Sequence, residues 1–294
     1  MRVNEKLDFD TLSDLVNKSP LASVKMLFSD IFKLISNPDA TARQLKCIIE
    51  RDPVLTMKIL TLANSVYYGS FKKISDILQA IVWLGFDTVV HLVFLTKLYG
   101  IFNENPKEIE HFRISLWKSS IASAIMGKVI FRREFSESGN LIYTAGLLHN
   151  IGALFISLAK SDHFFFIRDE MNRQKRDADS LELNHYGVDH ANLTSLIMKS
   201  WGLPDPLINI IKYHHNPVKS PLSCRKETLC LFLCDQIIHK KKLGFSDLYA
   251  YNDNKTQAVI NFLGLHETML LAVMYNVREE LEMMDKMGWF GHES

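Results

Sequence analysis

The chain has 294 residues, of which 47% are hydrophobic and 23% charged, and its formal net charge is +1. This balance is typical of globular proteins and gives no general reason to expect binding to nucleic acid or to an anionic membrane. No apolar run reaches the roughly 18 residues of a membrane-spanning helix, and residues 1–16 lack the apolar core of a signal peptide. We therefore expect a cytoplasmic protein without membrane contact.

Apolar residues recur at helical spacing through the N-terminal third. A first stripe begins at Leu21 and includes Phe28, and a second follows Pro53, which suits the first turn of a helix. A third begins at Ile74 and stops before Gly85, a residue common at helix C-termini. Because no sustained alternation of apolar and polar residues between turn signals is present, the sequence predicts an all-α protein made of many helices.

Polar segments mark the expected breaks between helices. Residues 103–111 contain Pro106 and several charges, which predicts the main internal boundary. Residues 172–180 indicate a solvated loop or helix end. Two of the four cysteines, Cys230 and Cys234, are one helical turn apart among apolar residues, and the cysteines lack the spacing of a zinc ribbon. We therefore expect this pair to be buried as small apolar side chains.

Several polar residues stand where the helical pattern places apolar ones. His190 shares a stripe with Leu193 and Ile197. The other members of this group are His149, His214 and Asp235, with His215 at the edge of its stripe. A buried ionised aspartate is costly unless it is paired or bound to a metal, so these side chains can satisfy one another only if they converge. Convergence is also what a metal centre requires.

Three stretches together resemble a known family. They are IIERDPVLTMKILTLANSVYYG (48–69), ISDILQAIVWLGFDTV (74–89), and residues 147–215, which run from LLHNIG to a terminal His-His. The family motif residues in them are Asp52, Pro53, Asn64, Ser65, Tyr67 and Trp201. With these motifs the chain resembles the HD-related output domain, or HDOD, family, a relative of the HD phosphohydrolases.

The resemblance implies a multi-helix fold with an HDOD domain over residues 18–216. An N-terminal helical lobe would span about 18–105, and an HD-phosphohydrolase-like lobe would span about 106–216. Residues 217–294 would form a C-terminal helical extension that completes the HD-like lobe.

The resemblance also implies a degenerate metal site. Active members of the wider superfamily take their metal from a histidine, an adjacent His-Asp pair and a later aspartate. The matching positions here are Ser119, His149-Asn150 and Asp235, so two of the four ligand positions lack a suitable side chain. His190, His214 and His215 resemble the additional histidines of two-metal relatives. A serine and a neutral amide hold a divalent cation more weakly than imidazole and carboxylate do.

Alternatives remain open at both groups of residues. The inward cluster is expected to be a hydrogen-bonded network without a cofactor, although His149, His190, His214 and Asp235 could hold zinc, iron or manganese, or line a small-molecule pocket. Asn64 and Ser65 are expected to shape the break between two helices. A partner-recognition role for Asn64, Tyr67 and Tyr68 is the alternative.

The resemblance favours a stand-alone, non-catalytic regulatory module of bacterial signal transduction that binds another protein. A protein partner is therefore expected, whereas binding to nucleic acid or to a membrane is not expected. The alternatives are a metal-dependent phosphohydrolase acting on a nucleotide or cyclic dinucleotide, and a sensor that binds a nucleotide without hydrolysing it. Ser119 and Asn150 argue against the enzyme.

Overall fold

The computed structural model describes residues 22–35, 37, 39–65, 73–102, 110–159, 170, 178–244, 251–286 and 290. Every regular element in these ranges is a helix, which confirms the predicted all-α class. The chain divides into a smaller unit, residues 19–101 with 201–203, and a larger unit that comprises the rest. The domain boundaries predicted above remain predictions.

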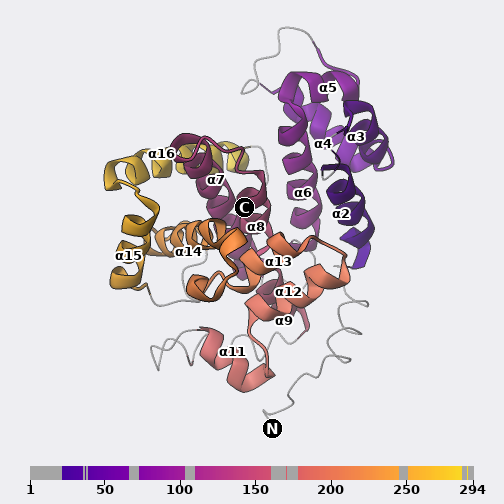
Figure 1. Ribbon diagram of the computed structural model, residues 1–294. Helices are drawn as coiled ribbons and strands as arrows, with labels where there is room; N and C mark the ends of the chain where they lie inside the picture. Colours follow the sequence, from indigo (N-terminus) through magenta and orange to yellow (C-terminus); the bar gives the residue numbers. More distant parts are fainter. Residues whose placement is uncertain are drawn as a thin grey trace. The chain divides into compact units, whose positions relative to one another are not determined.

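The described residues of the smaller unit contain five helices (Figure 1). They are α2 (Ala22–Ile35), α3 (Ala42–Ile49), α4 (Pro53–Ala63), α5 (Ile77–Leu84) and α6 (Phe86–Phe102). Aromatic rings fill part of the core, because the Phe28 ring lies 4.7 Å from that of Phe94, which also stacks with Phe32 at 5.5 Å. Edge and offset ring contacts of this kind add to the free energy gained by burial.

The helix ends of the smaller unit follow the sequence signals closely. Pro53 is the first residue of α4, and Gly85 ends α5 with a positive φ of 88°, as predicted. The start predicted for α5 at Ile74 was wrong, because the Asp76 carboxylate accepts hydrogen bonds from backbone N–H groups of the first turn and begins the helix at Ile77. Ile74 precedes the helix and is still buried.

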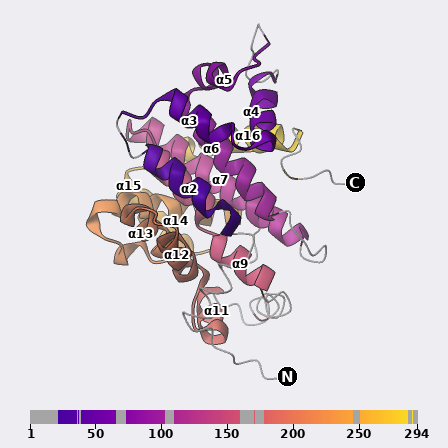
Figure 2. The same cartoon turned by 90° about the vertical axis from the view of Figure 1, so that its right-hand side faces the viewer.

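The larger unit is arranged around one long helix, α7 (Glu110–Glu134), which packs against α8 (Asn140–Leu148), α14 (Arg225–Lys240) and α16 (Glu267–Lys286) (Figures 1 and 2). The helix α12 (His190–Ser200) packs against both α9 (Ile151–Ala159) and α13 (Asp205–Lys212). The remaining helices are α11 (Ala178–Tyr186), α15 (Asp253–Leu263) and two short 3-10 turns, Pro217–Lys219 and Leu222–Cys224.

Small residues allow α7 and α8 to approach closely. A Cβ atom added at Gly146 would lie only 2.6 Å from the Cα of Ala124, so only glycine fits there. In the described part of the chain, α7 is long and apolar enough to cross a membrane, which the sequence had not suggested. However, 72% of its apolar window is buried inside the protein, and two bent helix pairs pass the same test only when each is counted as one span.

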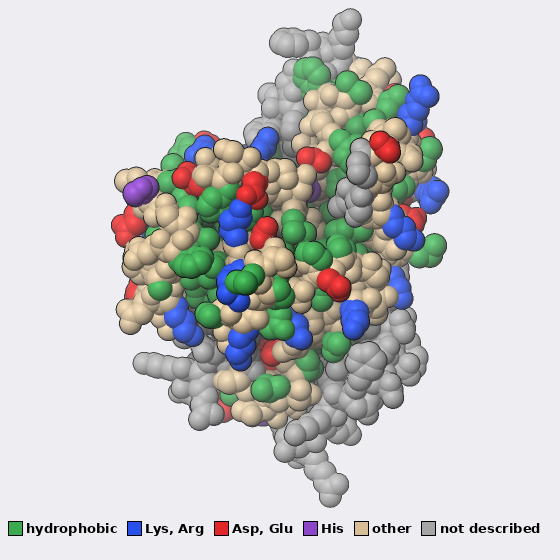
Figure 3. Space-filling model, in the orientation of Figure 1, with side chains coloured by type: hydrophobic (Ala, Val, Ile, Leu, Met, Phe, Trp, Pro, Cys, Tyr) green, Lys and Arg blue, Asp and Glu red, His purple; other side chains and the backbone are tan. Residues whose placement is uncertain are grey.

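One further sequence prediction is confirmed, and another lies outside the described residues. The helix α6 is described as far as Phe102 and α7 from Glu110, so the break predicted at Pro106 falls among residues that the structure does not describe. Cys230 and Cys234 are fully buried free thiols. On the face shown in Figure 3, the described basic and acidic side chains are interspersed and form no large patch of one sign.

Candidate functional site

The inward polar residues lie at helix ends and within one helix of the larger unit. His149 ends α8, His190 begins α12, and His214 and His215 follow α13 directly. Asp235 lies in the middle of α14. The side chains of His149, His190 and His214 are fully buried, Asp235 is 8% exposed, and His215 is partly buried. The predicted inward orientation is therefore confirmed for this group.

The four imidazole rings converge on one another. The ring centroid of His214 lies 3.6 Å from that of His215, 5.1 Å from that of His149 and 5.6 Å from that of His190. The rings of His190 and His215 are 5.0 Å apart. These four side chains, which we call the histidine cluster, come from three separate chain segments. Helix packing in the larger unit brings them together.

Backbone carbonyl groups fix two of the rings. Nδ1 of His149 lies 2.7 Å from the carbonyl oxygen of Gly146, and Nδ1 of His214 lies 2.6 Å from that of Ile211. A carbonyl oxygen only accepts, so Nδ1 carries the proton in both rings and Nε2 of the neutral ring keeps its lone pair. Both Nε2 atoms are buried without a hydrogen-bond partner.

A carboxylate fixes the third ring. Oε2 of Glu182 accepts hydrogen bonds from both Nδ1 and the backbone N–H of His190, each at 2.7 Å. Nε2 of His190 is therefore left as an acceptor, and it lies 2.9 Å from Nε2 of His215. The sequence had not singled out Glu182. The sequence offers only a weak sign of this role: Glu182 precedes by eight residues the histidine that it contacts, and its burial is seen only in the structure.

The electrostatic environment favours the neutral imidazole form of His214 and His215. Burial lowers the pKa of His214 and of His215 well below the usual value, and the neighbouring histidines add to this shift. Burial alone would raise the pKa of Asp235, but His149 and the other nearby histidines outweigh it and hold that pKa below its usual value. Oδ1 of Asp235 lies 3.5 Å from Nε2 of His149. Neutral imidazole is the form that binds metal ions.

The positions that align with the remaining HD ligands have other partners. The Asn150 amide donates to the hydroxyl of Ser120 at 3.2 Å. The hydroxyl of Ser119 donates to the carbonyl oxygen of Leu116 at 2.8 Å. The backbone of Ser119 packs closely against Gly244. Neither side chain offers a carboxylate or imidazole, so the position of the HD ligands does not fit the metal that HD enzymes bind.

Thr194 connects two segments of the cluster and was also missed from the sequence. Its hydroxyl accepts from the backbone N–H of Gly152 at 2.8 Å and lies 2.7 Å from the carbonyl oxygen of His190 and 3.1 Å from that of His149. A Cβ atom at Gly152 would lie 2.3 Å from the same His190 oxygen. Glycine at this position therefore permits the close approach of α9 and α12.

The family motif residues of the smaller unit have structural roles. Asp52 caps α4 by accepting from the N–H of Leu55 at 3.0 Å, and it forms an ion pair with Lys97. Burial tends to raise the pKa of Asp52, but the hydrogen bond and charge of Lys97 hold it below its usual value. Trp201 is buried, with its ring 5.5 Å from that of Phe28.

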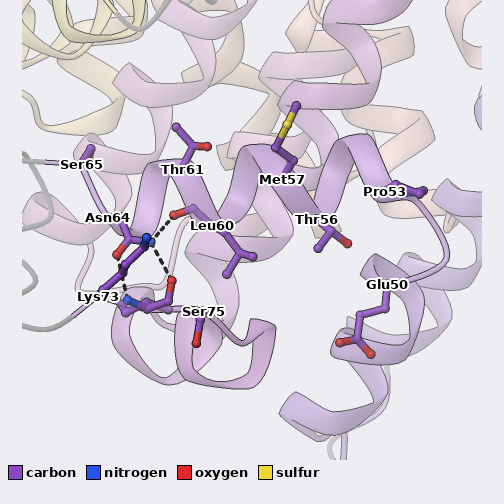
Figure 4. Close-up of a pocket in the computed structure, with 11 residues that line it drawn as sticks. Glu50, Pro53, Thr56, Met57, Leu60, Thr61, Asn64, Ser65, Lys73 and Ser75 are labelled. Carbon is purple, nitrogen blue, oxygen red and sulfur yellow. Dashed lines mark hydrogen bonds between the residues drawn. The ribbon is translucent and has the colours of Figure 1, made fainter.

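Asn64 joins two segments of the smaller unit (Figure 4). Its amide nitrogen donates to the carbonyl oxygens of Leu60 at 2.7 Å and Ile74 at 2.8 Å, and its Oδ1 accepts from the N–H of Ile74 at 2.8 Å. Although Asn64 is exposed, its amide makes three hydrogen bonds within the protein, which favours the helix-break interpretation over partner recognition. The hydroxyl of Ser65 is buried without a partner, and Tyr67 lies outside the described residues.

An open groove runs along α4 in the same unit. Its lining residues are Glu50, Pro53, Thr56, Met57, Leu60, Thr61, Asn64, Ser65, Lys73, Ile74 and Ser75. Figure 4 shows Glu50 and Lys73 toward opposite ends of this set. Met57 is 60% exposed, and Val54, three residues earlier on α4, is 57% exposed. The groove therefore combines apolar contact area with polar groups.

Residues 21–217 match the family model of the HDOD domain. The chain belongs to the HDOD domain family. A protein of Treponema pallidum (strain Nichols), described only as uncharacterized, is 24% identical over 214 residues, which are 72% of this chain. The chain spans 40% of the length of that relative.

Solved structures share the HDOD fold. An HDOD domain protein of unknown function from Geobacter sulfurreducens superposes with a TM-score of 0.72 at 22% identity, covering 94% of this chain and 98% of that one. A protein of Marinobacter aquaeolei VT8 proposed to act in signal transduction gives 0.70 at 21% identity, covering 98% and 68%. A proposed phosphohydrolase of Shewanella amazonensis SB2B gives 0.64 at 21% identity, covering 92% and 96%.

Proposed function

We propose that this protein is a non-catalytic regulatory module of bacterial signal transduction that acts by binding another protein. The observation that carries the proposal concerns Asn150, which follows His149 at the position where HD enzymes have an aspartate. Its side-chain amide donates a hydrogen bond to the hydroxyl of Ser120. A neutral amide lacks the negative charge with which a carboxylate holds and bridges catalytic cations. The likeness in fold to the Marinobacter protein supports the signalling role.

The groove along α4 is the partner-binding surface in this proposal. Met57 offers exposed apolar area in the groove, and Glu50 and Lys73 add opposite charges to it. Val54, which is also exposed, lies on the same helix outside the groove lining. Apolar contacts rimmed by polar groups are typical of protein interfaces, whose central apolar side chains contribute most of the binding energy.

The test compares two variants that place the same charge on exposed apolar positions. Met57→Glu changes the groove, whereas Val82→Glu changes a 76% exposed position on α5 that does not line it. Proteins captured from the native cell by each variant and by the wild type are quantified by mass spectrometry. We expect a specific partner to be lost with Met57→Glu and retained with Val82→Glu. Equal capture by all three proteins would contradict the groove as the binding surface.

A metal-dependent phosphohydrolase is the second candidate, and the histidine cluster is the observation that favours it. The activity test measures hydrolysis of a phosphodiester and of cyclic dinucleotides with manganese added. Turnover that His149→Ala abolishes would replace the non-catalytic proposal. A nucleotide that raises the unfolding temperature without being hydrolysed would indicate a sensor instead.

A further inference from the structure

Two exposed apolar side chains stand on the connection between α13 and α14 (Figure 1). Val218 is 74% exposed and Leu222 is 80% exposed, and each lies in one of the two 3-10 turns of residues 217–224, which we call the proline turns. Lys219 lies between them, is also exposed, and forms no ion pair within the described part of the chain. The proline turns therefore present apolar area together with positive charge.

Hydrogen bonds hold the proline turns in one shape. The backbone N–H of Ser220 donates to the carbonyl oxygen of Pro217 at 3.1 Å, and that of Cys224 donates to the carbonyl oxygen of Pro221 at 3.2 Å. The guanidinium group of Arg225 donates to the carbonyl oxygen of Ser220 at 2.6 Å. Each proline also fixes its own φ. Little conformational entropy is left for this segment to lose on binding, which favours its use as a contact surface.

A second exposed surface combines apolar area with negative charge. Leu271 and Tyr275 are one turn apart on α16, and both side chains are exposed. The next turns of the same face carry Glu279, which accepts a hydrogen bond from the hydroxyl of Tyr275, and Glu282. Arg278 adds one positive charge, so the surface as a whole is negative. We call these five residues the α16 face.

We propose that the proline turns of one copy of this chain dock on the α16 face of a second copy. Both surfaces belong to the larger unit, and they are complementary in charge. Apolar side chains suit the centre of such a contact, and the opposite charges select which surfaces meet. The inference goes beyond the proposed function, because neither surface includes the α4 groove.

The difference between the two surfaces determines how the copies assemble. Each copy has one set of proline turns and one α16 face, so a pair joined by one contact still has one of each to which further copies can add. Each surface offers far fewer side chains than the roughly 20–30 residues per partner of a stable interface. We therefore expect weak, concentration-dependent association with a dissociation constant on the order of 10–100 μM.

Sedimentation equilibrium of the full chain, from well below to well above that concentration, tests self-association. The average mass of the wild type should rise beyond that of two chains. Leu222→Glu and Leu271→Glu change exposed positions and keep the fold, but each buries a carboxylate among apolar side chains of the contact, so each variant alone should stay monomeric. Val82→Glu, the same change at an exposed position on α5, is the matched control and should associate like the wild type.

Mixing the two variants separates this pairing from other forms of self-association. Leu222→Glu keeps its α16 face and Leu271→Glu keeps its proline turns, so an equimolar mixture should form a one-to-one dimer and grow no further. The proposal is overturned if the wild type stays monomeric, or if the mixture stays monomeric while the wild type associates. If the wild type stays monomeric but binds phosphatidylglycerol vesicles, and Leu222→Glu does not, the proline turns contact a membrane instead.

Discussion

Replacing Asn64 with alanine tests whether this family motif residue acts in folding. The change removes three hydrogen bonds of 2.7–2.8 Å, one to Leu60 within α4 and two that join Asn64 to Ile74 in the segment before α5. Each is worth about 1 kcal/mol net, and the N–H and C=O of the buried Ile74 lose their partners. We therefore expect the free energy of unfolding to fall by about 3 kcal/mol.

Urea unfolding followed by tryptophan fluorescence and circular dichroism measures this loss. With a typical slope of about 2 kcal/mol per molar urea, the midpoint of the smaller unit should fall by roughly 1.5 M. Ser65→Ala is the control, because the adjacent hydroxyl is buried without a partner and its removal should change stability by less than about 0.5 kcal/mol. If Asn64→Ala matches this control yet abolishes partner capture, Asn64 serves recognition and our account of it is wrong.

Two further predictions concern the larger unit. Gly146→Ala should destabilise it by about 1–3 kcal/mol in thermal unfolding because the new methyl group meets the backbone of Ala124, and an unchanged unfolding temperature would disprove the contact. The pKa values of His214 and His215 are lowered in the folded state, so the unfolded chain takes up protons first as the pH falls below about 6.5. With a chelator present, the free energy of unfolding measured with urea should be highest above that pH. Below it, the free energy should decline by up to about 1.4 kcal/mol per pH unit for each histidine. A flat profile between about pH 7.5 and 5.5 would contradict neutral buried rings.

Local signals in the sequence predicted the helices and several of their ends. Proline and glycine have fixed conformational preferences, so Pro53 and Gly85 marked helix ends correctly. Ile74 misled the prediction, because its apolar spacing continues that of α5 although Asp76 begins the helix. Burial at that position comes from packing between segments, which apolar spacing does not distinguish from helix.

The sequence predicted which residues belong to the site, but not how they are arranged in space. Periodicity identified His149, His190, His214 and Asp235 as inward residues, since each stands on an apolar stripe. Their convergence depends on how α8, α12, α13 and α14 pack, and helix spacing carries no information about contacts between residues on separate helices. Glu182 could not be found in this way, because its partner is set by tertiary contact.

The hydroxyl of Thr194 links the backbones of two histidines of the cluster. It lies within hydrogen-bond distance of the carbonyl oxygens of both His149 and His190, and Gly152 packs closely against the carbonyl oxygen of His190. A shift of the His190 backbone would therefore disturb the contact of Thr194 with His149 as well. The start of α9, where the N–H of Gly152 donates to the same hydroxyl, depends on this one side chain too.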